Sequence, residues 1–309
     1  MSFKFWALSS KEYCETLKSG EFSDTEILVG EVPDTKVFKL HSLILKVRSP
    51  YFRKALSGDK IKVENNIIKH EIPNISVKVF DILIKYIYNG TIDLTKNDLK
   101  TNIALLIAIG ELHLNNLNSI ISTHILKDQV SLKKNLVLIQ HVTTKYAQFT
   151  GRLSGFYKTT IRQDPSMIFK TDDFVTINKD VLLNLVKNNK SLKQIEVWDK
   201  LKEWAIAQSR ELPSDTEKWT SNEMTTFATT IKSFIPLINF KEISPADFSQ
   251  KIKPFKNFGG NNSDLRLLKE NTSKGQCYKN SYEKLIRQDE GIFEVDDFEV
   301  FQVFKKARK

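Results

Sequence analysis

The 309-residue sequence is poor in cysteine, and no apolar run in it is long. Cys14 and Cys277 lie far apart and form no Cys-x-x-Cys pair, so nothing suggests a disulfide framework and we expect a reducing compartment. The longest apolar run, 103–110, is far shorter than the roughly 20 residues that span a bilayer. No signal-peptide pattern follows Lys4. We therefore expect a soluble cytoplasmic protein, with the nucleus as the alternative, and no membrane partner.

Motifs of catalysis and cofactor binding are also missing. The sequence has no GxxxxGK[ST] loop, no GxGxxG after a strand, no HExxH and no GxSxG. Its five histidines include no pair three or four residues apart, so no metal site is expected. The carboxylate pairs 172–173 and 296–297 lie beside aromatics, where helix capping or solvated charge explains them. We expect no enzymatic activity and no cofactor.

The net charge of +10 raises the question of a nucleic-acid partner. Lys and Arg alternate with Asp and Glu along most of the chain, and the densest basic run, KKARK, stands at 305–309. A nucleic-acid-binding domain gathers its basic residues on one face or along one helix. We interpret the charge as a solvated lysine-rich surface and expect no nucleic-acid partner, with a weak polyanion site as the alternative.

Hydrophobic residues are plentiful, and their spacing predicts two kinds of structure. The 40% hydrophobic content and 20 Phe can fill real cores, and the length suits two or three domains. Up to residue 127 short strands alternate with capped helices. The expected elements are a helix at 10–18 capped by Ser10, strands at 25–30, 36–41, 67–72 and 91–94, and helices capped by Ser42, Ser49 and Ser76, followed by helices at 98–114 and 117–127.

After residue 128 the strand pattern gives way to helical periodicity. Residues 195–209 show the widest apolar stripe, which contains Trp198 and Trp204; we expect both to pack in a core. The character changes again near residue 255, where a loop-like stretch follows, and 295–304 alternates as a strand does. The chain therefore divides into an α+β part, an all-α part and a short β-rich part.

The first part resembles a BTB/POZ domain. The resemblance rests on Ser23-Asp24 before the first strand, on VFKLH followed by LIL at 37–45, on RSPYF at 48–52 and on IKYIYNGTIDL at 84–94. It implies an α+β fold over 1–127, a small sheet with helices. It also implies that His41, where the second strand turns into a helix, packs inside the domain.

Two further resemblances follow along the chain. Residues 128–255 resemble a BACK domain, an all-α domain, most specifically in EVWDKLKEWAIAQ at 196–208. Residues 256–309 resemble the C-terminal end of a TLDc domain whose front two-thirds is missing. About 50 residues alone make a marginal core, and the remaining strands would have open edges, so we expect this remnant to be poorly ordered or packed on other helices or a second chain.

The BTB–BACK order implies an interaction protein. Such proteins are typically homodimeric substrate receptors of cullin-3 ubiquitin ligases, in which BTB binds the cullin and a C-terminal domain holds the substrate. The resemblance implies a dimer interface on the first helix, with Tyr13, Cys14 and Leu17, and on the helix after Ser42. It also implies an unidentified substrate protein as a partner.

The implied cullin surface follows the RSPYF helix. We expect Tyr51, Ile61, Glu64 and Tyr88 to form it. The family often carries hydrophobic-x-Glu there, whereas this chain reads IKVE at 61–64. Three alternatives stay open. They are an oligomeric scaffold without a ligase role, a deletion product with no function left, and a BTB transcriptional repressor, for which Asp24 is present but a basic residue after His41 is not.

Overall fold

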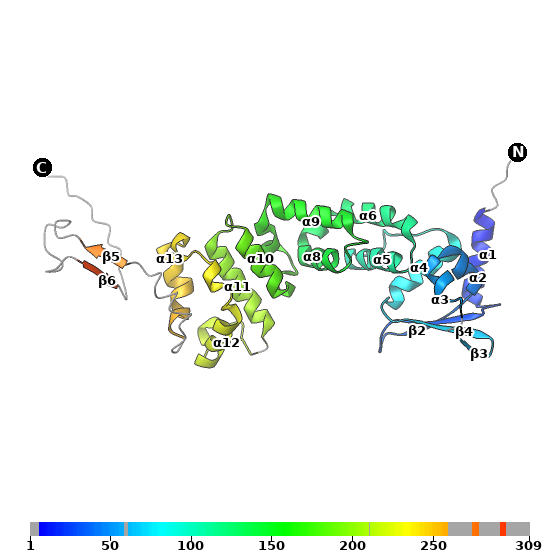
Figure 1. The fold of residues 1–309 in the computed structure, drawn as a ribbon, viewed down its shortest axis with the longest axis horizontal. Coiled ribbons are helices and arrows are strands. Elements are labelled where there is room, and N and C mark those ends of the chain that lie inside the picture. The colour runs from blue at the N-terminus through cyan, green and yellow to red at the C-terminus, as the bar shows by residue number, and fades with distance from the viewer. Residues whose placement is uncertain (1–5, 59–60, 210, 259–273, 278–290, 295–309) are drawn as a thin grey trace. The chain divides into compact units, whose positions relative to one another are not determined.

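The computed structural model describes residues 6–58, 61–209, 211–258, 274–277 and 291–294. The chain divides into two compact units, Met1–Phe174 and Val175–Lys309 (Figure 1). The predicted boundary at 127/128 lies inside the first unit, where the helices on its two sides pack together. That boundary stays a prediction.

The first unit begins with a mixed α and β region and continues as helices. Its elements are α1 Trp6–Ser19, β1 Thr25–Val29, β2 Lys36–Leu40, α2 Ser42–Arg48, α3 Pro50–Ala55, β3 Lys62–Glu64, β4 Ile67–Ile72, α4 Val77–Asn89, α5 Leu99–Glu111, α6 Asn118–Lys127, α7 Gln129–Lys134, α8 Leu136–Lys145 and α9 Gly151–Gln163, with 3₁₀ turns at Asn115–Leu117 and Pro165–Lys170.

A four-stranded sheet in the order β2-β1-β4-β3 carries the helices α2 and α3 on one face (Figure 1). β1 pairs antiparallel with β2 and parallel with β4, and β3 pairs antiparallel with β4. Ile27 lies opposite Phe38 on one side and His70 on the other. Because partners in register share a face, His70 points to the same side as the buried Ile27 and Phe38.

Several predicted helix ends are confirmed. The Ser49 hydroxyl accepts from Phe52 N–H at 3.3 Å, and Pro50 occupies the first position of α3, where its missing N–H has no intrahelical partner to lose. The Ser76 hydroxyl accepts from Val79 N–H at 3.4 Å. Gly90 ends α4 in the left-handed region at φ 76°, a conformation that glycine adopts without a steric penalty.

Two predicted caps are wrong. α1 begins at Trp6, so Ser10 lies within the helix rather than at its start. Ser42 is the first residue of α2, and it donates to a carboxylate instead of capping the helix itself. That carboxylate belongs to Asp24, which lies next to the helix in space but far from it in sequence.

The strands also differ from the prediction in two places. Thr91–Leu94 forms no strand, because Asn89 Oδ1 accepts from Thr91 N–H at 2.7 Å and folds the chain into a turn. Conversely, β3 was not predicted. It joins β4 through Asn65 and Asn66 at φ 51° and 64°, the positive values that a two-residue type I′ hairpin requires.

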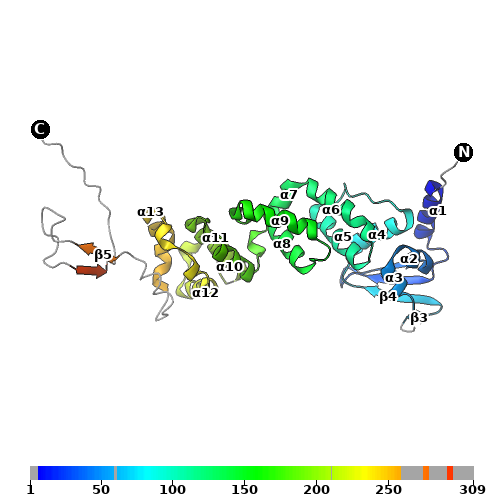
Figure 2. The ribbon, with the colours of Figure 1, turned by 45° about the horizontal axis from the view of Figure 1, so that its top comes forward.

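The helices α5 to α9 form the rest of the first unit. In Figures 1 and 2, α6 and α9 lie over α5 and α8, and these helices pack on one another. Gly110 allows the close packing, because a Cβ there would stand 2.3 Å from the Phe149 ring. Asp173 confirms the expected capping role by accepting from Leu138 N–H at 2.8 Å, in the first turn of α8.

The second unit is helical where it is described, apart from one pair of short strands. Its helices are α10 Lys179–Asn188, α11 Gln194–Gln208, α12 Ser221–Ile231 and α13 Pro245–Asp247, with a π turn at Phe248–Ile252 and 3₁₀ turns at Thr216–Lys218, Ile235–Leu237, Phe240–Glu242 and Lys253–Phe258; another 3₁₀ turn at Phe174–Thr176 spans the division between the units.

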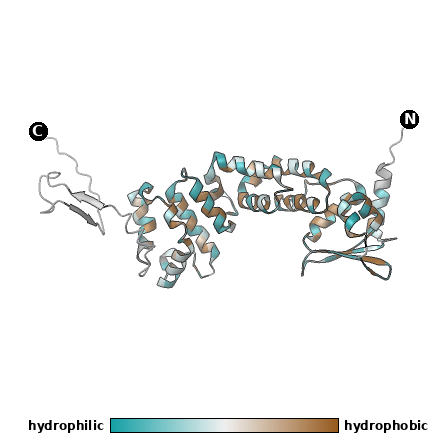
Figure 3. Cartoon of the chain, viewed as in Figure 1, coloured by the Kyte–Doolittle hydropathy of each residue, from teal (hydrophilic) through white to brown (hydrophobic). Residues whose placement is uncertain are grey.

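Aromatic side chains fill the core of the second unit. Trp198 is buried, and its ring centroid lies 6.1 Å from that of Phe227 and 5.8 Å from that of Phe255. Trp198 Nε1 donates to Lys251 O at 3.0 Å, and Trp204 Nε1 donates to the backbone of the same unit. Both tryptophans are therefore core residues, as predicted. Figure 3 shows brown apolar residues along α11, where this stripe lies.

Little of the predicted C-terminal remnant is described. β5 Lys274–Cys277 pairs antiparallel with β6 Gly291–Glu294. The predicted strand at 295–304, the carboxylate pair 296–297 and the basic run 305–309 lie outside the described residues. The β-rich remnant therefore stays a prediction.

Candidate functional site

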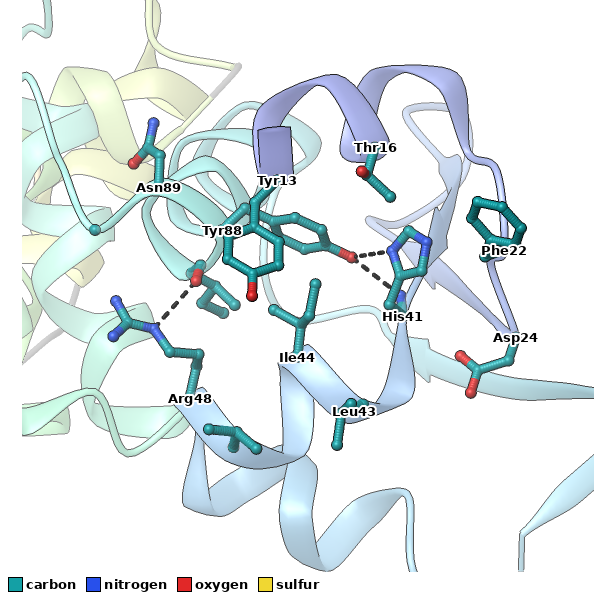
Figure 4. Close-up of a pocket in the computed structure, with 13 residues that line it drawn as sticks. Tyr13, Thr16, Phe22, Asp24, His41, Leu43, Ile44, Arg48, Tyr88 and Asn89 are labelled. Carbon is teal, nitrogen blue, oxygen red and sulfur yellow. Dashed lines mark hydrogen bonds between the residues drawn. The ribbon is translucent and has the colours of Figure 1, made fainter. Parts of the chain in front are cut away.

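The candidate site is a groove of about 920 Å³ beside α1 and α2 (Figure 4). Its walls come from α1, from the turn before β1, from α2 and from the end of α4. Four apolar side chains of this groove are exposed: Phe22 is 90% exposed, Leu43 72%, Val47 63% and Tyr13 49%. Leu43 and Val47 stand four residues apart on α2 and therefore lie on one side of that helix.

A buried histidine and a tyrosine form the floor of the groove. Tyr88 accepts from His41 N–H at 3.0 Å and lies 2.8 Å from His41 Nδ1, while His41 Nε2 lies 2.7 Å from Glu21 O. A carbonyl can only accept, so Nε2 carries the proton, and in neutral His41 the Tyr88 hydroxyl then donates to Nδ1. This network of hydrogen bonds leaves none of these polar groups unpaired. His41 therefore has a structural role, as the sequence predicted.

Burial determines the protonation of this tyrosine. Loss of water around the hydroxyl raises the pKa of Tyr88 to about 12, and the hydrogen bond from the His41 backbone opposes that rise. Tyr88 therefore favours its neutral form, in which the hydroxyl can donate.

Asp24 binds the first residue of α2 at one edge of the groove. Its Oδ1 accepts from Ser42 N–H at 2.6 Å and its Oδ2 accepts from the Ser42 hydroxyl at 2.5 Å. Partial burial raises the pKa of Asp24, but the hydrogen bonds from Ser42 and Thr25 outweigh burial and leave this pKa below its ordinary value. A carboxylate thus anchors α2, which carries two of the exposed apolar side chains.

Arg48 stands at the other end of α2. Its Nε donates to Ile87 O at 3.1 Å, as Figure 4 shows, and its guanidinium lies 5.6 Å from the centroid of the Tyr86 ring. Both contacts tie α2 to α4. The groove therefore has a negative group at one end, a positive group at the other and an apolar surface between them, which suits docking of another protein surface.

The predicted dimer residues lie partly in this groove. Tyr13 lines it and is half exposed. Cys14 is a free cysteine and is partly buried, and Leu17 packs against the core of the unit. Tyr13 thus belongs to the groove, whereas Leu17 has a packing role that the helical pattern alone did not separate from an interface role.

A second candidate surface lies around α3, β3 and β4. The Tyr51 hydroxyl stands 3.0 Å from His70 Nε2, and both side chains are half-buried. Ile61 is half-buried just before β3, and Glu64 is exposed at its end. Ile61, Glu64 and His70 line one cavity of about 550 Å³, so the structure brings Ile61 and Glu64 together.

Burial changes the titration of this second surface. Loss of solvent lowers the pKa of His70, and the carboxylate of Glu71 opposes that change. Burial also raises the pKa of Tyr51, with a further rise from the negative charge of Glu111. Both groups therefore favour their neutral forms, in which the Tyr51 hydroxyl can donate to the His70 ring.

Tyr88 does not join Tyr51, Ile61 and Glu64. It is 5% exposed and its hydroxyl is taken up by His41, on the floor of the groove. We therefore correct its place: Tyr88 supports the groove and is not an aromatic anchor of the second surface. The sequence places Tyr88 at the end of a helix, and α4 is buried along most of its length.

Sequence reasoning placed the helix after Ser42 on the expected dimer surface, but it did not name the residues of that helix that line the groove, Leu43, Val47 and Arg48. Phe22, which also lines the groove, was not singled out. One signal was present: Leu43 and Val47 lie on the side of α2 opposite Leu45, so the three side chains cannot all face the core. Phe22 gives no such signal, because its exposure follows from a turn with φ 61° at that residue.

The described residues hold no group of three or more His, Cys, Asp or Glu side chains placed to bind a metal ion. Within the same residues, every helix is too short or too polar to cross a membrane.

Comparison with known proteins identifies the first region. Residues 13–129 match the family model of the BTB/POZ domain. Kelch repeat and BTB domain-containing protein 4 of Mus musculus is 32% identical over 79 residues, which cover 26% of this chain and 14% of that protein. The Homo sapiens protein of the same name gives the same identity and coverage. The match therefore spans about one seventh of the length of these relatives.

Two solved structures are also similar. The BTB domain of zebrafish PATZ1 is 21% identical, with a TM-score of 0.33, and the match covers 41% of this chain and 99% of that one. The BTB domain of human Gigaxonin is 22% identical, with a TM-score of 0.30, over 39% of this chain and 93% of that one. The family match shows that residues 13–129 form a BTB/POZ domain, a protein–protein interaction module.

Proposed function

We propose that this chain is an interaction adaptor that dimerises through its BTB domain and serves as a substrate receptor of a cullin-3 type ubiquitin ligase. The observation that carries the proposal is the apolar groove of the BTB domain, with four exposed apolar side chains that a monomer would leave in water. The second surface, around α3, is then free for another partner.

The groove is the proposed dimer surface. In a twofold dimer the same patch of each subunit meets its copy, so Leu43 and Val47 of one chain would pack against the equivalent region of the other. Burying these side chains together with Tyr13 and Phe22 removes apolar area from water, at about 25 cal/mol per Å². The exposed apolar contacts are thus the main source of affinity.

The surface with Tyr51, Ile61 and Glu64 is the proposed cullin contact. Tyr51 is held by His70, and Glu64 is presented at the end of β3 beside a tight turn. Because Glu64 is paired with Ile67 in the sheet, it would lose less backbone entropy on binding than a residue in a loop. The IKVE stretch departs from the family pattern, however, and for that reason the scaffold without a ligase role is the second candidate.

The remaining regions have proposed roles as well. Residues 128–255 would act as a BACK-like spacer, and 256–309 would be a truncated TLDc remnant. The chain would supply proximity and orientation, while the recruited ligase enzymes carry out the chemistry. We propose the cytoplasm as its location. Rapid proteolysis after about residue 256 would support the proposal that 256–309 is a truncated remnant. Resistance to proteolysis equal to that of the helical core would contradict it.

A calorimetric titration of the full chain with the cullin-3 N-terminal domain tests this function. We expect binding at one adaptor per cullin, weakened by Ile61→Asp and by Glu64→Lys. Val32→Asp is the matched control, because Val32 is 89% exposed in the turn between β1 and β2 and does not line the cavity of Ile61 and Glu64.

The outcomes separate the two candidates. Binding that the control preserves and the two surface variants lose supports the adaptor. No complex from a folded dimer would favour the scaffold. Unchanged binding in both variants, or in Tyr51→Ala, would remove this surface as the contact.

A further inference from the structure

The helices α6 to α9 carry charge of nearly one sign. Residues 118–163 contain a single acidic residue, Asp128, and that carboxylate accepts from Ser131 N–H at the start of α7. All of the Lys and Arg side chains in this range are exposed. They are Lys127, Lys133, Lys134, Lys145, Arg152, Lys158 and Arg162. The even mixture of charges along most of the chain therefore does not extend to this region of the first unit.

None of these cations makes an ion pair with a described residue. The salt bridges of the described chain lie elsewhere, for example between Lys69 and Glu26 on the sheet and between Lys251 and Asp199 in the second unit. Arg152 is held by hydrogen bonds to Ser119 O and to the Thr123 hydroxyl, at 3.3 and 2.6 Å, rather than by a carboxylate. Burial raises the pKa of Glu111 and the Lys145 ammonium opposes that rise, so the charge of Lys145 is partly compensated. The other six cations have no ion-pair partner among the described residues.

Exposed apolar side chains stand among the cations. Ile120 is 55% exposed on α6, and Val130 is 70% exposed on α7. Ile120 and Lys127 are seven residues apart and so share one side of α6, the side on which Arg152 meets Thr123. Val130 and Lys133 are three apart and share one side of α7. Figure 3 shows hydrophilic teal along α6 and α9.

We propose that this basic face, defined as Ile120, Lys127, Val130, Lys133, Lys134 and Arg152, docks an acidic segment of a partner protein that carries aliphatic side chains between its carboxylates. The carboxylates would pair with the lysines and Arg152, and the aliphatic groups would cover Ile120 and Val130. The proposal concerns neither the groove nor the α3 surface, so it goes beyond the function proposed above.

The apolar content favours a peptide over a nucleic acid. Single-stranded nucleic acids stack on aromatic rings, and the well-exposed large hydrophobic side chains of this face are aliphatic. A duplex is bound mainly through its phosphates, and phosphates offer no apolar partner for Ile120 and Val130. Charge complementarity to carboxylates, combined with apolar burial, fits both kinds of exposed side chain.

The test uses the full chain and a labelled synthetic peptide, acetyl-EELDELEEIDEL-amide, measured by fluorescence anisotropy. The control peptide replaces every Glu by Gln and every Asp by Asn. Lys127→Glu/Lys133→Glu should weaken binding at least about tenfold, which is about 1.4 kcal/mol. The matched control is Lys187→Glu/Lys190→Glu, which makes the same charge change at exposed positions of the second unit. Ile120→Ser/Val130→Ser should weaken binding without changing its salt dependence.

The proposal is supported if the acidic peptide binds, the amide peptide does not, and only the variants of the basic face lose affinity. Equal losses in the two charge variants would show a general charge effect and overturn it. Tighter binding of a mixed-sequence DNA duplex would assign the face to nucleic acid.

The chain also carries an acidic stretch of its own at 294–299. One outcome is that the peptide binds only to a variant in which Glu294, Asp296, Asp297 and Glu299 are neutralised. That result would show that this stretch of the chain itself occupies the basic face, and it would overturn the proposal of a partner protein. None of these outcomes depends on cullin binding, because its variants lie on a different surface.

Discussion

The BTB domain contains two tyrosine–histidine pairs, which have different roles because their surroundings differ. In the groove, Tyr88 and His41 are buried, and both ring nitrogens and the His41 N–H have partners. On the α3 surface, Tyr51 and His70 meet at 3.0 Å but are only half-buried. The same two residue types therefore form a closed structural network in one place and an accessible polar pair in the other.

The difference shows that burial, rather than residue type, determines the role. A buried donor or acceptor without a partner costs about 1–3 kcal/mol, whereas water can replace a partner lost at the surface. The groove pair consequently fixes the position of α2 and its exposed apolar side chains. The α3 pair is free to respond to a partner or to pH.

Removing the hydroxyl of the buried tyrosine should give the largest effect. Tyr88→Phe leaves the His41 N–H and Nδ1 unpaired in the interior, so the free energy of unfolding should fall by about 1–3 kcal/mol. Urea denaturation followed by circular dichroism measures it. A loss below that of Tyr51→Phe would show that the groove network is not a closed structural unit.

The anchor of α2 should matter next. Asp24→Ala removes both acceptors of Ser42 and should cost about 1 kcal/mol, as the loss of a helix cap does. Because the pKa of Asp24 is lowered on folding, its contribution is present above the unfolded value, about 3.9, and is lost as pH falls through the folded value. A wild-type to variant difference that stays constant on acidification would contradict this anchor.

Mutation of the accessible pair, Tyr51 and His70, should lower the free energy of unfolding by less. Tyr51→Phe leaves His70 within reach of water, so the free energy of unfolding should fall by about 0.5 kcal/mol, the low end for one hydrogen bond. The measurement is the same urea titration, run beside Tyr88→Phe. Equal losses of unfolding free energy in the two variants would contradict the claim that the two tyrosine–histidine pairs have different roles.

The smallest effect should appear as a pH dependence. The pKa of His70 is lowered on folding, so its neutral form is favoured in the folded state. Its contribution to stability is full above the unfolded pKa, about 6.5, and is lost as pH falls through the folded value. His70→Gln should therefore lose less stability than the wild type between pH 7 and pH 5. An identical loss in both would contradict this assignment.

Local signals predicted much of the fold, and spatial neighbours account for what they missed. The Ser49-Pro50 and Ser76 caps lie within a few residues of what they cap, so the sequence shows them. Asp24 anchors α2 across 18 residues, which no local pattern reveals. The Asn65-Asn66 hairpin could have been predicted from the sequence, although it was not, because asparagine adopts positive φ values readily.

The candidate site was predictable only in outline. Tyr13 was expected at the dimer interface, which stays a prediction, and it lines the groove; His41 was correctly expected inside the domain. The burial of Tyr88 depends on how α1, α2 and α4 pack, which requires the three-dimensional structure.

Sedimentation equilibrium of the full chain tests the central claim, that the groove is the surface through which two copies associate. The wild type should be a dimer and Leu43→Glu a monomer with an unchanged circular dichroism spectrum, because a charge at a 72% exposed position harms the interface and not the fold. Val63→Glu, exposed outside the groove, should remain dimeric. A monomeric wild type, or a Leu43→Glu variant that stays dimeric, would contradict the account.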